Sequence, residues 1–273
     1  MPKKLKPRQK RKPRSERICG LPVSDRADYR VITAIGDLLR AVGRCRAQLF
    51  AGEPRTEQEC VSAMLGHVYD AAASAVTGVS MLLSHGGRIA PYMMGRLCFE
   101  YMVRAEYCAA HPDYAQWALR LQFLRSNLRY NDAILSNKDK RIMGDRLRRE
   151  ERCLPKLSPH AREEAGLVPF HQITFTDMML DVLDTHDPEA YRRQSMLMHA
   201  DPYAIATLDE VDVAAVNREL VEACVALARI GTLIYERVTL GAIAEEEFRA
   251  ACARIDDLST VYGNLGVLDK AAS

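Results

Sequence analysis

Apolar residues recur along most of the chain at intervals of three and four, which is the spacing of one face of an α-helix. The first such run covers residues 27–50, and the second begins at Thr56, which forms with Glu59 the sequence pattern of a capping box. This second run continues to Ser84, where a Gly-Gly pair indicates a helix end. No stretch alternates in the manner of a half-buried strand. The pattern therefore predicts an all-α fold, a helical bundle of about six to eight helices.

The rest of the chain continues the helical pattern with clear breaks. A third helix is expected over residues 89–110, and Pro112 suits the first turn of a long fourth helix that becomes strongly charged beyond Asn137. Prolines and polar residues predict a loop with a short helix over residues 153–172. Further segments are expected to be helical over 173–183, from Pro188 to Asp201, within 208–240 and over 242–255.

Charge and proline content divide the chain into an arm and a body. Residues 1–17 contain nine Lys or Arg and one acidic residue, Glu16, so residues 1–20 are expected to be a disordered basic arm. Such an arm can bind phosphates, or it can be a solvated tail. Residues 21–256 are expected to form a single helical domain, and residues 257–273 a frayed C-terminal tail.

Composition narrows the environment of the protein. Hydrophobic residues make up 48% and aromatic residues only 7%, which suits helices built from Ala and Leu. The eight cysteines include no Cys-x-x-Cys pair, so we expect reduced thiols, a cytoplasmic location, no metal site and no cofactor. No apolar run reaches the length of a membrane span, so no membrane partner is expected.

The densest cluster of reactive side chains is the segment Tyr191–Pro202. On a helix, Arg192, Ser195 and His199 fall within about 60° of one another. A Ser–His pair suggests acyl transfer, but the sequence has no nucleophile elbow, and the Ser195 hydroxyl can bond its own helix backbone. An Arg–His pair suits phosphodiester chemistry, because Arg stabilises phosphoryl oxygens and His transfers protons near neutral pH. Arg192 aligns with His199 after about two turns, whereas Arg193 points away.

A second polar pattern lies on the expected third helix. Arg96, Glu100 and Arg104 follow one another at intervals of four, so they share one helix face. These residues form either a surface ladder of ion pairs, which would contribute little to stability, or an ion pair in the interior. The apolar residues around them favour the interior pair.

The spacing from Arg192 or Arg193 to His199, in a late helix of an all-α chain, resembles the HEPN superfamily (higher eukaryotes and prokaryotes nucleotide-binding). More closely, Arg96-x-x-x-Glu100 with Tyr191-x-x-x-Ser195-x-x-x-His199 resembles a bacterial helical family of unknown function. The resemblance implies a homodimer that binds RNA or a nucleotide and cleaves RNA without a metal. It also implies that Arg192 or Arg193 forms the catalytic pair with His199, and the helical alignment selects Arg192. The expected supporting residues are then Arg96, Glu100, Tyr191, Arg193, Ser195 and Asp201. In the family Asn, Asp or His often follows the Arg, whereas Gln194 follows Arg193 here.

The sequence leaves two functions open. One is a HEPN-like metal-independent endoribonuclease or nucleotide-binding protein in a bacterial defence or stress system. The other is a non-catalytic helical adaptor in which the Arg, Glu, Ser and His side chains form a buried structural network. A cleft over His199 would favour the first, and burial of His199 among apolar side chains the second.

Overall fold

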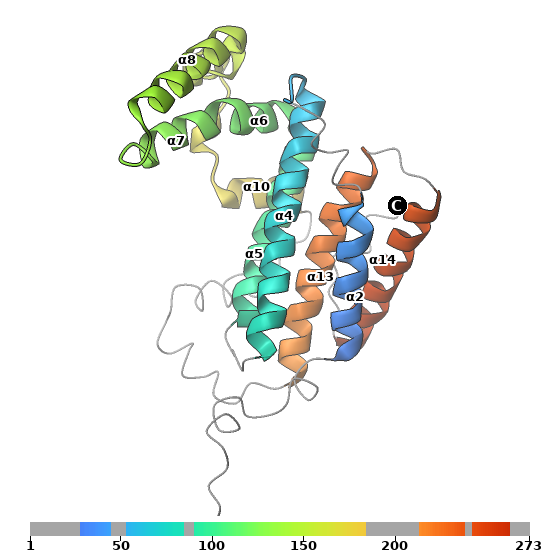
Figure 1. The fold of residues 1–273 in the computed structure, drawn as a ribbon. Coiled ribbons are helices and arrows are strands. Elements are labelled where there is room, and N and C mark those ends of the chain that lie inside the picture. Colours follow the sequence, from blue (N-terminus) through green and yellow to red (C-terminus); the bar gives the residue numbers. More distant parts are fainter. Residues whose placement is uncertain (1–27, 45–52, 85–89, 184–212, 238–241, 263–273) are drawn as a thin grey trace, which may run out of the picture.

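The computed structural model describes residues 28–44, 53–84, 90–183, 213–237 and 242–262. Within these ranges the regular elements are helices and there is no strand, so the predicted all-α class is confirmed. Figure 1 shows an elongated bundle with a smaller helical arm at one end. The bundle contains α2 (Tyr29–Gly43), α4 (Glu57–Ser84), α5 (Ala90–Ala110), α13 (Val213–Tyr235) and α14 (Ala242–Tyr262), with α10 (Phe175–Val182) packed against α5.

The hydrophobic core follows the length of α5 and α13. Helix α5 packs against both α4 and α13, while α2 and α14 cover another side of α13. Leu65, Met102 and Leu227 come from three of these helices and are almost completely buried. Burying each such side chain contributes about 1.5–3 kcal/mol, so this shared core holds the bundle together.

The arm has a small core of its own. It consists of α6 (Pro112–Trp117), the π-helix η2 (Ala118–Gln122), α7 (Phe123–Tyr130), α8 (Asn137–Cys153), the 3-10 turns η3 (Pro155–Leu157) and η4 (Phe170–Gln172), and α9 (Pro159–Glu164). Trp117, Leu121, Leu157 and Phe170 are buried together at its centre. The Arg162 guanidinium lies 3.6 Å from the centroid of the Phe170 ring, which covers this core with a cation–π contact.

Two sequence predictions about helix boundaries are wrong. The long fourth helix ends at Tyr130, because Asn131 leaves the helical region and Ser136 then caps a separate helix by accepting a hydrogen bond from the Asp139 N–H at 3.1 Å. The last helix continues past residue 255 to Tyr262, so residues 257–262 are not a frayed tail. Buried Leu258 holds this final part of the helix against the core, a contact that lies beyond the predicted helix end.

Other predicted boundaries are confirmed. The Thr56 hydroxyl accepts a hydrogen bond from the Glu59 N–H at 3.2 Å, and the Glu59 carboxylate accepts one from the Thr56 N–H at 2.8 Å, which is the expected capping box. Pro112 is the first residue of α6. The expected basic arm, residues 1–20, and the segment from Pro188 to Asp201 lie outside the described residues, as do residues 263–273. Among the described residues, no helix combines the length and hydropathy needed to cross a membrane.

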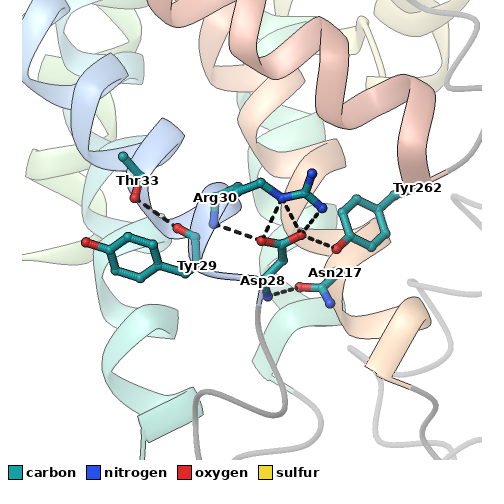
Figure 2. Close-up of polar contacts among 6 residues, drawn as sticks. All are labelled: Asp28, Tyr29, Arg30, Thr33, Asn217 and Tyr262. Atoms are coloured by element: carbon teal, nitrogen blue, oxygen red, sulfur yellow. Dashed lines mark hydrogen bonds and ion pairs between the residues drawn. The ribbon is translucent and has the colours of Figure 1, made fainter.

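Asp28 joins three helices at one end of the bundle (Figure 2). It caps α2, its backbone N–H donates to the Asn217 side-chain oxygen of α13 at 2.7 Å, and the Tyr262 hydroxyl of α14 donates to its carboxylate at 2.5 Å. The guanidinium of Arg30 pairs with the same carboxylate at 2.5 Å. Hydrogen bonds from Arg30 and Tyr262 hold the pKa of Asp28 well below its ordinary value, so the cluster depends on the ionised carboxylate.

Replacement of Asp28 by Asn tests this dependence, because Asn caps helices about as well as Asp but carries no charge. The folded-state pKa is depressed, so the charge stabilises the fold above the unfolded-state value near 3.8, and this stabilisation disappears as the pH falls towards the folded-state pKa. We expect Asp28→Asn to unfold at lower urea concentration than the wild type at pH 7, and the gap to be clearly smaller at about pH 2, because the gap narrows as the pH falls below the unfolded-state pKa of 3.8. Asp132→Asn, at an exposed ion pair, is the control and should show little gap at either pH. A gap for Asp28→Asn that is independent of pH would contradict this role.

Gly231 allows α13 to approach its neighbours closely. A Cβ atom at this position would lie 2.9 Å from the Phe248 ring and 3.0 Å from a Val42 methyl group. Overpacking of this kind costs about 1–3 kcal/mol and outweighs the helix-propensity gain of about 1 kcal/mol, so Gly231→Ala should lower the free energy of unfolding. Gly36→Ala in α2 is the matched control, since a Cβ there meets no atom within 4 Å, and it should raise stability. Urea unfolding distinguishes the two, and equal stabilisation by both would contradict the close packing.

Candidate functional site

Helix α5 carries charged side chains into the interior of the bundle. The Arg96 side chain is only 10% exposed, and that of Glu100 is 19% exposed. Arg96 Nε donates to Glu100 Oε1 at 2.8 Å, and Arg96 Nη2 lies 2.6 Å from the same oxygen. The sequence left open whether this pair lies inside the protein or on its surface, and the structure shows that it is an interior pair.

Arg104 extends this pair into a group of three, which we call the α5 charge cluster (Arg96, Glu100 and Arg104). Its Nη2 lies 3.7 Å from Glu100 Oε2, so the carboxylate faces a guanidinium on each side along the helix. Phe175 of α10 lies over the Arg104 guanidinium at 5.9 Å and makes an edge contact with Phe99 of α5. The cluster contains two cations and one carboxylate, and its excess positive charge lies towards solvent because the Arg104 side chain is 43% exposed.

A second interior pair lies further along α5. Glu106 Oε1 lies 2.6 Å from Nε of Arg229 on α13. Burial raises the pKa of Glu106, and the neighbouring Arg229 opposes this rise. The sequence gives no sign of this pair, because residues on two separate helices share no spacing that a single helix pattern reveals. A buried pair between α5 and α13 fixes the register of the two central helices.

This second pair borders a cavity of about 500 Å³ between α5, α10, α13 and α14. Asp181, Arg237 and Asp256 also line it. Oδ2 of Asp181 lies 2.6 Å from Nε2 of His111. His111 follows the last residue of α5, so this contact connects the end of α5 to α10. The cavity thus combines carboxylates and guanidinium groups, most of which are already paired with one another.

A larger cavity of about 970 Å³ lies between the first turns of α4 and the arm. The π-helix contributes Leu119 and Arg120 to its wall, and α7 contributes Phe123. Arg120 is engaged by Glu150 at 2.5 Å and donates to the Arg55 carbonyl at 3.0 Å. π-Helical turns occur frequently at functional sites, so this wall is a candidate ligand-binding surface. Its arginine, Arg120, already has protein partners.

The remaining residues singled out from the sequence lie in the range 184–212, outside the described residues. These are Tyr191, Arg192, Arg193, Ser195, His199 and Asp201. The helices that precede and follow this range are α10 and α13, and both pack against α5. The structure therefore describes Arg96 and Glu100, and the roles of all the predicted site residues remain predictions.

Cysteine chemistry is unfavourable in the described core. Cys98 and Cys108 are buried, and desolvation raises the pKa of each thiol to about 12. A thiol with such a pKa carries almost no thiolate at neutral pH, so neither residue is suited to nucleophilic catalysis. Within the described residues, no group of three or more His, Cys, Asp or Glu side chains is placed to hold a metal ion.

Comparison of the chain with protein-family models, with curated proteins and with solved structures gave no match in any of the three.

Glu100→Gln tests the interior charge cluster. The variant leaves Arg96 buried without its carboxylate, and removing one partner of a buried pair costs about 3–5 kcal/mol, or slightly less here because Glu100 is partly exposed. Glu245→Gln is the matched control, because Glu245 and Arg249 form an ion pair at the same spacing on the surface of α14 and should contribute less than about 0.5 kcal/mol. Chemical unfolding measures the loss of stability in both variants. Similar small losses would show that burial does not strengthen the ion pair between Arg96 and Glu100.

Proposed function

We propose that the protein is a HEPN-like, metal-independent endoribonuclease or nucleotide-binding protein of a bacterial defence or stress system, acting as a homodimer. The observation that carries the proposal is the α5 charge cluster, an interior carboxylate between two arginines on the helix that both α10 and α13 contact. Residues 184–212 connect these two helices, so the segment with Arg192 and His199 is attached at both ends to neighbours of α5.

The proposed reaction divides the work between two side chains. His199 accepts the proton of a ribose 2′-hydroxyl, the 2′-oxygen attacks the adjacent phosphorus, and the bond to the 5′-oxygen breaks as that oxygen gains a proton. Arg192 binds the scissile phosphate and stabilises its developing negative charge. Glu100 is the carboxylate that would orient the imidazole by accepting its second N–H. Tyr191, Arg193, Ser195 and Asp201 have supporting roles.

The alternative is a non-catalytic adaptor, and one observation favours it. Arg96 and Glu100 pair at hydrogen-bond distance, so the pair satisfies its own charges without a substrate. Under this alternative, Ser195 and His199 complete a buried network with Arg96 and Glu100, and the protein acts by presenting its surface to a partner.

His199→Ala distinguishes the two functions. If the protein is the proposed nuclease, the rate of RNA cleavage falls by about 10²-fold or more in His199→Ala, because general acid–base catalysis contributes at least that factor. The melting temperature changes little. His160→Ala is the control, since His160 is 83% exposed and lies on α9 of the arm, and it should keep full activity. Equal cleavage by the wild type and His199→Ala would contradict the catalytic assignment. A large fall in melting temperature, with no cleavage by either protein, would support the adaptor.

A further inference from the structure

Helix α8 separates its charges between two faces. Leu147 on its inner face and Leu154, which follows its last residue, pack against the small core of the arm. Glu150 and Glu151 flank this apolar strip, and both point to arginines of the arm, Glu150 to Arg120 at 2.5 Å and Glu151 to Arg125 at 2.8 Å. Two of the four carboxylates of the helix are thus used in inward ion pairs.

The opposite face of α8 carries the cations. We call it the α8 basic face, and it consists of Lys138, Arg141, Arg148, Arg149 and Arg152, all of which are exposed. At about 100° per residue these five side chains fall within about 100° of one another. Asp145 is the acidic residue among them, and it pairs with Arg148 at 2.6 Å. Within the described residues, no carboxylate pairs with Lys138, Arg141, Arg149 or Arg152, so the face carries a net charge of about +4.

The dimensions of this face suit an extended polyanion. The distance along the helix from Lys138 to Arg152 is about 21 Å, which is long enough to follow several consecutive phosphates of one nucleic-acid strand. The helix also stands at the outer edge of the arm, where Figure 1 shows it on the side away from the bundle. A strand can therefore reach the whole face without displacing another element among those described.

An exposed aromatic side chain precedes the turn that leads into α8. Tyr130, the last residue of α7, is 72% exposed, and the turn that follows it is held to the first turns of α8 by the ion pair of Asp132 with Lys140 at 2.7 Å. The Arg129 guanidinium lies 5.4 Å from the Tyr130 ring. An exposed aromatic ring near a row of cations is an arrangement by which proteins stack an unpaired base while they bind the backbone.

We infer that the α8 basic face binds single-stranded nucleic acid, with its arginines on the phosphates and Tyr130 stacked on a base. A membrane surface is a poorer fit, because an interfacial helix needs an apolar face and Ile142 is the apolar residue near this one. The inference goes beyond the proposed catalytic function, since it concerns binding at a different surface and does not require Arg192 or His199.

The test is the binding of a labelled single-stranded 2′-O-methyl oligonucleotide to the full-length protein. This backbone has no free 2′-hydroxyl, so binding is measured without cleavage. The triple variant Arg141→Gln, Arg149→Gln, Arg152→Gln should bind about 100-fold more weakly at 0.1 M salt, and the slope of log affinity against log salt should become shallower by about 2, because three phosphate contacts are lost. The N-terminal basic residues are unchanged in every protein compared.

A charge-matched control uses Arg40→Gln, Arg44→Gln and Arg249→Gln, three exposed arginines of α2, its C-terminal end and α14. This control should bind as the wild type does, and equal losses in the two triple variants would overturn the inference. Tyr130→Ala should weaken binding of the single strand by about fivefold and leave binding of the matching duplex unchanged. If polyglutamate displaces the oligonucleotide as well as an unlabelled strand does, the face recognises acidic chains in general, and a nucleic-acid site is excluded.

Discussion

The burial of charge on α5 is the constraint on which the rest of the structure depends. This helix is covered by α4 on one side and α13 on another, yet its sequence places Arg96, Glu100 and Glu106 within the covered length. A buried ion is tolerated only with a partner of opposite charge, so each of these side chains fixes a neighbour. Glu100 is paired along its own helix, whereas Glu106 requires Arg229 and thereby sets the position of α13 relative to α5.

Ion pairs between elements also hold the arm together. Its core is small, with four buried side chains at its centre, and ion pairs from α8 supplement it. Glu150 and Glu151 hold α8 in place, so on the outer face Asp145 alone of the helix's carboxylates compensates the cations, by pairing with Arg148. The inward ion pairs account for the position of α8, but they do not require cations on its outer face. A helix with no buried residue and a one-sided charge is poorly explained by folding alone, which is why a binding role is reasonable for it.

Patterns along the sequence predicted the features that depend on residues close together in the chain. The capping box of Thr56 and Glu59, the start of α6 at Pro112 and the pairing of Arg96 with Glu100 all follow from residues within one helical turn or two. The pair of Glu106 with Arg229 could not be predicted, because its partners come from helices whose packing no short pattern encodes. The last turns of α14 were missed for a similar reason. The Tyr262 hydroxyl donates a hydrogen bond to Asp28, at the other end of the described chain. The residues next to Tyr262 in the sequence therefore do not indicate that the helix continues.

The central claim is that the carboxylate of Glu100 and the imidazole of His199 belong to one site. Nuclear magnetic resonance titration of the histidines measures this directly, with the His199 signal assigned by its absence in His199→Gln. If the two groups are in contact, the His199 pKa should be lower in Glu100→Gln than in the wild type by about one unit, because a nearby carboxylate stabilises the imidazolium form. An identical His199 pKa in the two folded proteins would contradict the claim and separate the α5 charge cluster from the proposed catalytic pair.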